Sequence, residues 1–142
     1  MSSFLDPPHT ALGALTVADA MHEGVITCLP SAELLEVAAA MVEHNIHCLV
    51  AIDAGPPGAD DDRLWGIVSD IDLMRGLGSR VRLDAGNLAT LDVIMVEPEE
   101  PLDRVAELMS EHDVSHLVVA KDGRPIGVLS TLDIARAITT HN

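Results

Sequence analysis

Two pairs of polar residues in this chain could take part in chemistry, and both pairs have the same spacing. Ser69 precedes Asp72 by three residues, and Ser130 precedes Asp133 in the same way. Each pair follows a short apolar run with a glycine, which predicts that the serine lies where a strand turns into a helix. Backbone N–H groups at a helix N-terminus bind anions, and a nearby carboxylate can bind ribose hydroxyls. The pattern therefore predicts two candidate sites for a nucleoside phosphate.

The same spacing is also typical of a helix cap that needs no ligand. In a capping box the serine side chain accepts a backbone N–H of the first turn, and the acidic side chain three residues later accepts the N–H of the serine. Short motifs of this kind match by chance in many chains. The residues by themselves leave both interpretations open.

The duplication extends far beyond the two pairs and predicts the architecture. The stretch from Ile26 to Val50 returns from Ile94 to Val118 without a gap. An internal repeat of this length indicates two equivalent units. The predicted fold class is α/β, of the α+β kind, with two β-α-β-β-α repeats packed about a pseudo-twofold axis. The repeats are expected at residues 15–77 and 87–140, with a linker at 78–86.

Each copy shows the apolar periodicity of one helix between short strands. The first helix follows Pro30 and ends near His44, and its counterpart ends near His112. A second helix is expected to begin near Ser69 and near Ser130. The spacing predicts that the inward faces of the first helices are buried, namely Val37, Met41, Val105 and Met109.

Composition excludes several classes of partner. The chain has 142 residues, 48% of them hydrophobic, and a formal charge of −15. That charge disfavours DNA, RNA and anionic membranes, and a single Trp, a single Phe and no Tyr leave few platforms for stacking bases. No apolar run reaches the length of a membrane span, and the N-terminus does not resemble a signal peptide. A cytoplasmic location is therefore expected.

The order of elements and the closing signature resemble a known family. The signature Gly-hydrophobic-x-Ser-x-x-Asp occurs at 66–72 and again at 127–133. Together with the helix and strand pattern, it is similar to a tandem pair of CBS domains, the regulatory module named after cystathionine β-synthase. The resemblance covers about residues 15 to 140. It implies a stand-alone regulatory pair without enzymatic activity, which binds an adenosine-containing nucleotide and signals to a partner protein that the sequence does not name.

The resemblance also implies two clefts between the repeats, each built from both copies. The first would combine the closing pair of one copy with strand residues of the other: Ser130, Asp133, Thr27, Ile46 and Cys48. The second would combine Ser69, Asp72, Met95, Val114 and His116. His44 and His112 would lie where some members place a basic residue against phosphate, although a histidine there also suits a helix C-terminus. The candidate ligands are AMP, ADP, ATP and S-adenosylmethionine, and no cofactor is required.

The first cleft is predicted to bind more tightly. Thr27 matches a frequent threonine of the family, whereas its counterpart Met95 does not, and Asp70 adds a carboxylate beside the second cleft. The few basic residues favour AMP or ADP over ATP without Mg²⁺.

Two other functions remain open, a dimerisation or scaffold domain and a metal- or redox-responsive protein. A homodimer is expected because the second helices carry more apolar residues than they can bury internally: Leu73, Met74, Leu77, Ile134 and Ile138. One alternative is therefore a ligand-free dimerisation or scaffold domain. The other is a metal- or redox-responsive protein that uses Cys48 and the histidines at 44, 47, 112 and 116. Because the histidine spacings differ between the copies, no metal site is predicted, and Cys28 and Cys48 are expected to be buried thiols.

Overall fold

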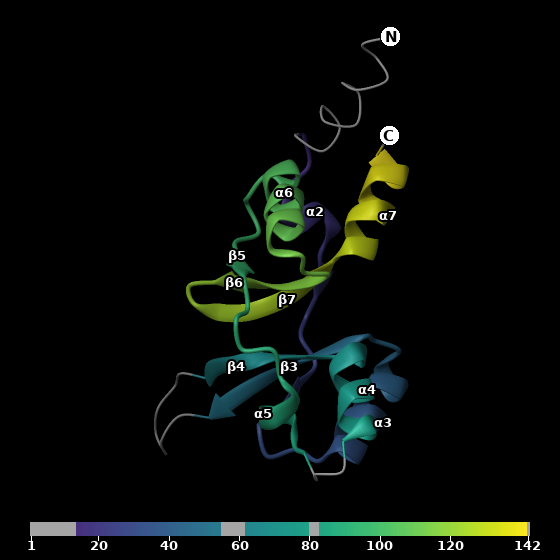
Figure 1. Ribbon diagram of the computed structural model, residues 1–142. Helices are drawn as coiled ribbons and strands as arrows, with labels where there is room; N and C mark the ends of the chain where they lie inside the picture. Colours follow the sequence, from purple (N-terminus) through teal and green to yellow (C-terminus); the bar gives the residue numbers. More distant parts are fainter. Residues whose placement is uncertain (1–13, 55–61, 80–82, 142) are drawn as a thin grey trace. The chain divides into compact units, whose positions relative to one another are not determined.

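The computed structural model describes residues 14–54, 62–79 and 83–141, and the chain forms two compact units (Figure 1). The continuous unit consists of Val25–Val93. The discontinuous unit consists of the chain up to Gly24 together with the chain from Ile94 onward. Each unit contains one sheet and its own helices, so the predicted mixed α/β class is confirmed.

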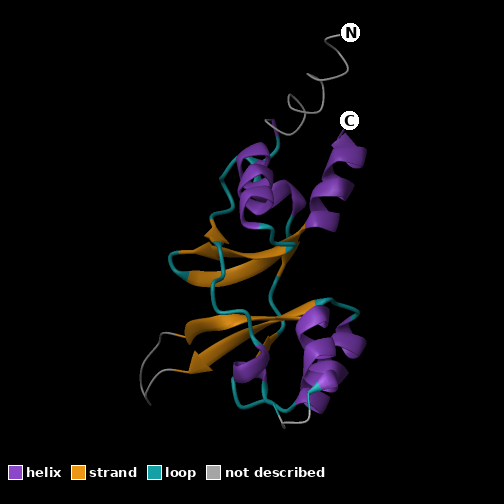
Figure 2. Ribbon diagram, viewed as in Figure 1, coloured by secondary structure: helices purple, strands orange, loops and turns teal. Residues whose placement is uncertain are grey.

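The continuous unit contains the first copy of the β-α-β-β-α order (Figure 2). Its elements are β2 (Thr27–Cys28), α3 (Leu34–His44), β3 (Cys48–Ala54), β4 (Asp62–Ser69), α4 (Asp70–Gly78) and α5 (Ala85–Leu88). The sheet has the order β2-β3-β4, with β2 parallel and β4 antiparallel to β3.

The discontinuous unit contains the second copy and two elements that precede the first. Its elements are α2 (Val17–Ala20), β1 (His22–Glu23), β5 (Met95–Val96), α6 (Leu102–His112), β6 (His116–Lys121), β7 (Arg124–Ser130) and α7 (Thr131–His141). The sheet order is β1-β7-β6-β5, and β1 pairs antiparallel with β7.

The first helix of each copy ends in the same way. Asn45 and Asp113 both adopt a left-handed conformation with φ of 52°. The N–H of Asn45 donates to the carbonyls of Met41 and Val42, which closes the last turn of α3. Asparagine and aspartate tolerate this conformation better than most residues, because their short polar side chains can bond locally. This explains why both copies turn from helix to strand at the same position.

The predicted core residues are confirmed. Val37 and Met41 of α3 are 1% and 7% exposed, and Val105 and Met109 of α6 are 1% and 3% exposed. In the continuous unit Val37 and Met41 pack with Leu49 of β3, Val68 of β4 and Leu88 of α5. The core of the discontinuous unit contains Leu15, Val17, Leu102, Leu117, Leu129 and Ile134.

The residues just before the first strand of each β-α-β-β-α copy pack on the other copy. We call residues 15–24 and 83–92 the lead segments; they lie 68 positions apart, as do Ile26 and Ile94. In the first, Thr16 bridges Pro101 and His22 pairs with Val128 of β7. In the second, Asp84 bridges Glu33, and Thr90 bridges Ile67 of β4. The two copies thus exchange their lead segments.

The glycine of each closing signature permits this exchange. A Cβ added at Gly66 would lie 2.5 Å from the carbonyl oxygen of Thr90. At Gly127 it would collide in the same way with the carbonyl oxygen of His22. Both positions therefore need a residue without a side chain, because a lead segment approaches the strand backbone closely.

The boundaries of the two compact units differ from the boundaries of the repeats predicted from the sequence. Helices α2 and α5 have four residues each, which is too short to show a helical period in the sequence. The segment 78–86 contains the end of α4 and the start of α5. The boundaries 15–77, 78–86 and 87–140 refer to the copies in the sequence and stay a prediction.

Candidate functional site

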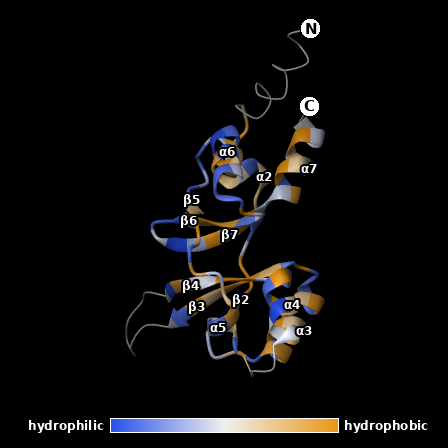
Figure 3. Ribbon diagram, viewed as in Figure 1, coloured by the Kyte–Doolittle hydropathy of each residue, from blue (hydrophilic) through white to orange (hydrophobic). Residues whose placement is uncertain are grey.

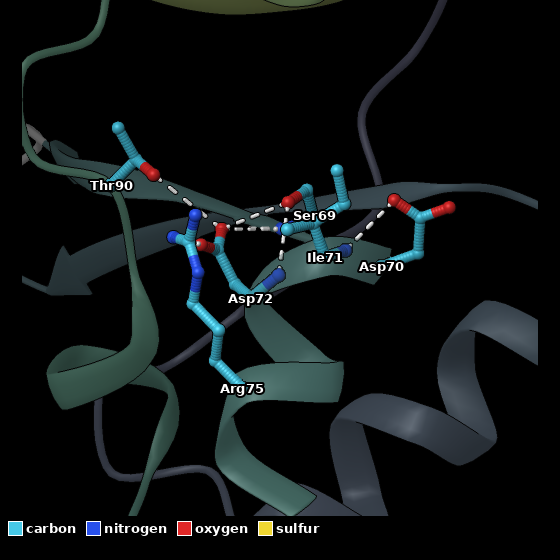
Figure 4. Close-up of polar contacts among 6 residues, drawn as sticks. All are labelled: Ser69, Asp70, Ile71, Asp72, Arg75 and Thr90. Carbon is cyan, nitrogen blue, oxygen red and sulfur yellow. Dashed lines mark hydrogen bonds and ion pairs between the residues drawn. The ribbon is translucent and has the colours of Figure 1, made fainter. Parts of the chain in front are cut away.

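Ser69 and Asp72 form a capping box at the N-terminus of α4 (Figure 4). The Asp72 side chain is 5% exposed. Its Oδ2 accepts the N–H of Ser69 at 2.9 Å and the Ser69 hydroxyl at 3.0 Å. The N–H of Asp72 donates in return to Ser69 Oγ at 3.2 Å. The carboxylate is thus fixed by its own helix, and one of its oxygens is committed to the cap.

The other neighbours of Asp72 bind it loosely. Arg75 Nη1 lies 3.4 Å from Oδ1, and the Thr90 hydroxyl lies 3.5 Å from Oδ2 (Figure 4). Both distances are at the upper limit for a hydrogen bond. Oδ1 therefore keeps most of its capacity to accept a hydrogen bond.

Ser130 and Asp133 repeat the cap at the start of α7. Asp133 Oδ2 accepts the N–H of Ser130 at 2.8 Å, and the N–H of Asp133 donates to Ser130 Oγ at 3.2 Å. Here Oδ1 has a close partner, because His22 Nε2 lies 2.8 Å away, while Arg136 Nη1 is 3.8 Å away. Asp133 is 3% exposed and His22 is 66% exposed.

Both closing pairs therefore act as caps. Capping does not use up the chemistry of the motif, since an ionised carboxylate has about four acceptor positions. Each pair presents a buried carboxylate beside a helix N-terminus, which can bind a hydroxyl and a neighbouring anion.

The two helix N-termini differ in how they would receive an anion. In the continuous unit Asp70 follows the cap, and its Oδ1 accepts the N–H of Ile71 at 2.9 Å. Its Oδ2 lies 3.3 Å from Nδ1 of His47. The position that corresponds to Asp70 in the discontinuous unit is Thr131, which has no charge. A carboxylate at a helix start would repel phosphate, and the start of α7 has no charged residue at this position.

The other predicted residues lie in their own units as follows. Thr27 is exposed on β2, Ile46 is half-buried, and Cys48 lies opposite Ser69 in the ladder of β3 and β4. In the discontinuous unit Met95 is 49% exposed on β5, Val114 is half-buried, and His116 lies opposite Ser130. Each predicted cleft combines residues of both units and stays a prediction.

The two helix-terminal histidines are exposed at the ends of α3 and α6. Nδ1 of His112 lies 3.0 Å from the carbonyl oxygen of Leu108. Because a carbonyl only accepts, Nδ1 carries the proton and His112 caps the last turn of its helix. For His112 the capping interpretation is therefore realised, and a role of His44 toward phosphate stays a prediction.

The cysteines are free thiols, and Cys28 has little tendency to ionise. Cys48 is buried and Cys28 is half-buried. Burial raises the pKa of Cys28 above its ordinary value of 9.0, and the negative charge of Glu36 raises it further. A protonated thiol is a poor nucleophile and a poor metal ligand. In the described parts of the chain no group of three or more His, Cys, Asp or Glu residues could hold a metal ion.

Sequence reasoning missed two residues that touch the carboxylates, His22 and Thr90. They occupy matching positions of the two lead segments, so extending the repeat upstream would have revealed the pair. Each of them packs against the carboxylate of the other copy because the copies exchange their lead segments. This exchange leaves no pattern in the sequence.

Comparison with protein families identifies the chain. The CBS domain model matches residues 17–79 and 85–140, which together are most of the sequence. The chain belongs to the CBS domain family. As a relative of this CBS pair, Hypoxic response protein 1 of Mycobacterium tuberculosis is 34% identical over 131 residues, which cover 89% of this chain and 87% of the relative. A structure of Hypoxic Response Protein I with two coordinated zinc ions has a TM-score of 0.67 at 30% identity, covering 85% of this CBS pair and 97% of that chain.

Two further CBS structures resemble this one and contain adenosine compounds. The CBS domain pair of protein MJ0100, in complex with 5′-methylthioadenosine and S-adenosyl-L-methionine, has a TM-score of 0.79 at 26% identity and covers 89% of this chain and 98% of its own. CBSX2 in complex with AMP has a TM-score of 0.72 at 26% identity, with coverage of 89% and 98%. Within the described residues of this CBS pair, no helix has the length and apolar character needed to cross a membrane.

Proposed function

We propose that this CBS pair is a regulatory module that binds an adenosine-containing nucleotide and passes the signal to a partner protein. The observation that carries the proposal is the pair of buried carboxylates, Asp72 and Asp133, held in the same capping geometry at two helix N-termini. A carboxylate fixed in this way is prepared to accept the hydroxyls of a ribose, with the phosphate near the helix start. The AMP and S-adenosyl-L-methionine complexes of similar CBS pairs support this choice of ligand.

The chemistry of the chain favours a ligand with few charges. The formal charge is −15, with only eight Lys and Arg residues. Among the described residues, Arg75 and Arg136 are the arginines that contact the two carboxylates. AMP, ADP or S-adenosylmethionine should therefore bind better than ATP without Mg²⁺. A regulatory role without catalysis accords with these features, and a cytoplasmic location stays a prediction.

Isothermal titration calorimetry with AMP, ADP, ATP with and without Mg²⁺, and S-adenosylmethionine tests the proposal. Asp133→Ala should weaken AMP binding roughly ten- to a hundredfold, because charge-assisted hydrogen bonds contribute about 1.5–3 kcal/mol. Asp133 also caps α7, so thermal unfolding must show that the variant is folded. Asp133→Asn is the milder variant, since it keeps the size of the side chain and a cap acceptor.

Asp103→Ala is the matched control, because it removes a carboxylate from α6 at a position outside both closing signatures. It should bind AMP as the unchanged protein does. Absence of heat with every ligand at millimolar concentration would contradict the proposal and favour the scaffold function. A rise in melting temperature with Zn²⁺ alone would favour the metal-responsive function, since ligands that bind the native state stabilise it.

A homodimer is the second part of the proposal, and the exposed apolar residues of the continuous unit support it. Leu35 and Val42 of α3 are 79% and 83% exposed, and Met74 and Leu77 of α4 are 66% and 65% exposed. Three predicted interface residues behave differently. Leu73 of α4 packs against the core of the continuous unit, and Ile134 and Ile138 of α7 pack in or against the core of the discontinuous unit. We therefore assign the dimer contact to the continuous unit, where a second copy can cover the same face in a closed arrangement.

A further inference from the structure

We propose that His22 occupies the ligand's place on Asp133 and must leave before a ribose can bind there. This inference rests on the proposed function and assigns a specificity-determining role to a residue outside the closing signature. The lead segment that carries His22 belongs to the sequence before the first copy, whereas Asp133 belongs to the end of the second.

Each oxygen of Asp133 already has a polar neighbour. Oδ2 accepts the N–H of Ser130 at 2.8 Å, and His22 Nε2 lies 2.8 Å from Oδ1. The carboxylate is 3% exposed, so a hydroxyl from solvent has almost no surface to approach. Arg136 is the other charged group that faces it, at 3.8 Å. A ribose can therefore reach Oδ1 only if the imidazole ring moves aside.

His22 is able to move because most of its ring is in solvent. Its side chain is 66% exposed, so a change of rotamer transfers it into water without opening the core. The free energy of the lost His22–Asp133 contact is then subtracted from that of ligand binding. Since one partner is exposed, this contact contributes less than a fully buried one.

Displacement would also loosen the lead segment. Strand β1 has two residues, His22 and Glu23, and pairs with Val128 and Gly127 of β7. The N–H of Gly24 donates to the carbonyl of Ile126 at 2.9 Å next to this short ladder. With so few backbone bonds, the His22 side chain is a substantial part of what holds β1. Ligand binding at Asp133 would thus be transmitted to the residues that precede the first copy.

The other unit shows the same position without this competitor. Thr90 matches His22 in the second lead segment, and its hydroxyl lies 3.5 Å from Asp72 Oδ2, the oxygen already used by the cap. Arg75 Nη1 lies 3.4 Å from Asp72 Oδ1, so a ribose meets a weaker internal contact there. The residue at position 22 or 90 therefore determines how strongly an internal contact competes with the ligand for each carboxylate.

The test is AMP titration calorimetry of proteins that carry Asp72→Asn. This change removes the carboxylate of the other closing signature, so the measured affinity reports mainly on Asp133. His22→Thr, which copies the other lead segment, should bind AMP about three- to tenfold more tightly, the range expected for one modest hydrogen bond. His47→Thr is the matched control, because it removes an exposed histidine that faces Asp70 in the continuous unit. It should leave the affinity unchanged.

Amide hydrogen exchange gives a second readout. AMP should speed the exchange of the Gly24 N–H in the Asp72→Asn protein, because β1 is released, and should have little effect after His22→Thr. Equal or weaker AMP binding by His22→Thr, or slower Gly24 exchange with AMP, would overturn the inference while the proposed function stands. Absence of AMP binding in every variant, including the protein with both aspartates, would instead remove the proposed function and this inference with it.

Discussion

The first helices of the two copies have the same inner face and different outer faces. Inward, Val37 and Met41 of α3 correspond to Val105 and Met109 of α6, and all four are buried. Outward, the exposed Leu35 and Val42 of α3 correspond to Asp103 and Ser110 of α6. Figure 3 shows the hydropathy along both helices. The core conserves residue type because packing constrains it, whereas the surface follows what each unit meets. The comparison indicates that the two units share a fold and present different outer surfaces.

The closing signatures teach the same lesson at the site. Their caps share the two reciprocal bonds that involve the backbone N–H groups of Ser and Asp, and the Ser69 hydroxyl donates a further bond to Asp72. A second difference is the residue that each lead segment brings to the carboxylate, histidine in one unit and threonine in the other. The backbone arrangement is duplicated, whereas the neighbour outside the motif is not.

The largest effect is expected from core truncations that compare the two units directly. Leu102 at the start of α6 is 0% exposed, whereas its counterpart Leu34 is half-buried. Leu102→Ala should lower the free energy of unfolding by about 2–5 kcal/mol, because it leaves a cavity in the core. Leu34→Ala should cost clearly less. Urea denaturation measures both, and equal losses would show that the two cores are packed alike at this position.

The second largest effect is expected at Gly66 and Gly127, the glycines that the lead segments approach closely. Gly66→Ala and Gly127→Ala should each cost about 1–3 kcal/mol, since the new methyl group displaces a lead segment from its strand. The two losses should be similar because the exchange is reciprocal. Gly78→Ala is the control, as nothing lies within 4 Å of its added Cβ. If thermal unfolding shows that either glycine tolerates alanine as Gly78 does, that lead segment is not held where the structure places it.

Exchanging the outer residues of α3 and α6 tests whether the outer face of α3 forms the proposed dimer contact. Leu35→Asp with Val42→Ser gives α3 the residues of α6, and should raise the dimer dissociation constant about tenfold or more, because it removes apolar area from the contact. The reverse change, Asp103→Leu with Ser110→Val, should leave that constant nearly unchanged. Sedimentation velocity at moderate salt, which screens the acidic surface, measures both. A monomer at micromolar concentration before any substitution would refute the dimer itself.

The smallest effect concerns an ion pair that occurs in the discontinuous unit. Lys121 Nζ lies 2.5 Å from Glu99 Oε1, and the matching positions of the continuous unit are Ser31 and Asp53. The hydrogen bond from Lys121 lowers the pKa of Glu99 below its ordinary 4.5, and the bond from Glu99 raises the pKa of Lys121 above 10.5. The pair therefore stabilises the fold between these values.

Glu99→Gln should lower the melting temperature slightly at neutral pH. The difference from the unchanged protein should shrink as the pH falls below 4.5, because the carboxyl of Glu99 then becomes protonated in both the folded and unfolded states. Both groups are fully exposed, so salt should also reduce the difference. A difference that stays constant from pH 7 to pH 3 would mean that the charge of Glu99 contributes nothing.

The sequence predicts the long elements well because each carries its own periodicity. The bounds of α3 and α6, the start of α4 after Ser69 and of α7 after Ser130, and the burial of Val37 and Val105 follow from local patterns. The capping geometry was one of two interpretations that the Ser-x-x-Asp spacing allows.

The lead segments could not be predicted in the same way. Strand β1 has two residues, and α2 and α5 have four each, so none shows a period. Their packing depends on partners far along the chain, such as His22 with Asp133. The fate of Ile134 was mispredicted for a related reason, because an apolar residue on a helix gives no sign of whether core or partner covers it.

The exchange of lead segments also sets an order of events during synthesis. A chain made from its N-terminus presents Val25–Val93 in full before Ile94 has left the ribosome, so the continuous unit can fold at once. The first lead segment, although made earlier, must wait for β7 and α6, to which it pairs and packs. The first lead segment is therefore translated before the continuous unit and can pack only after it.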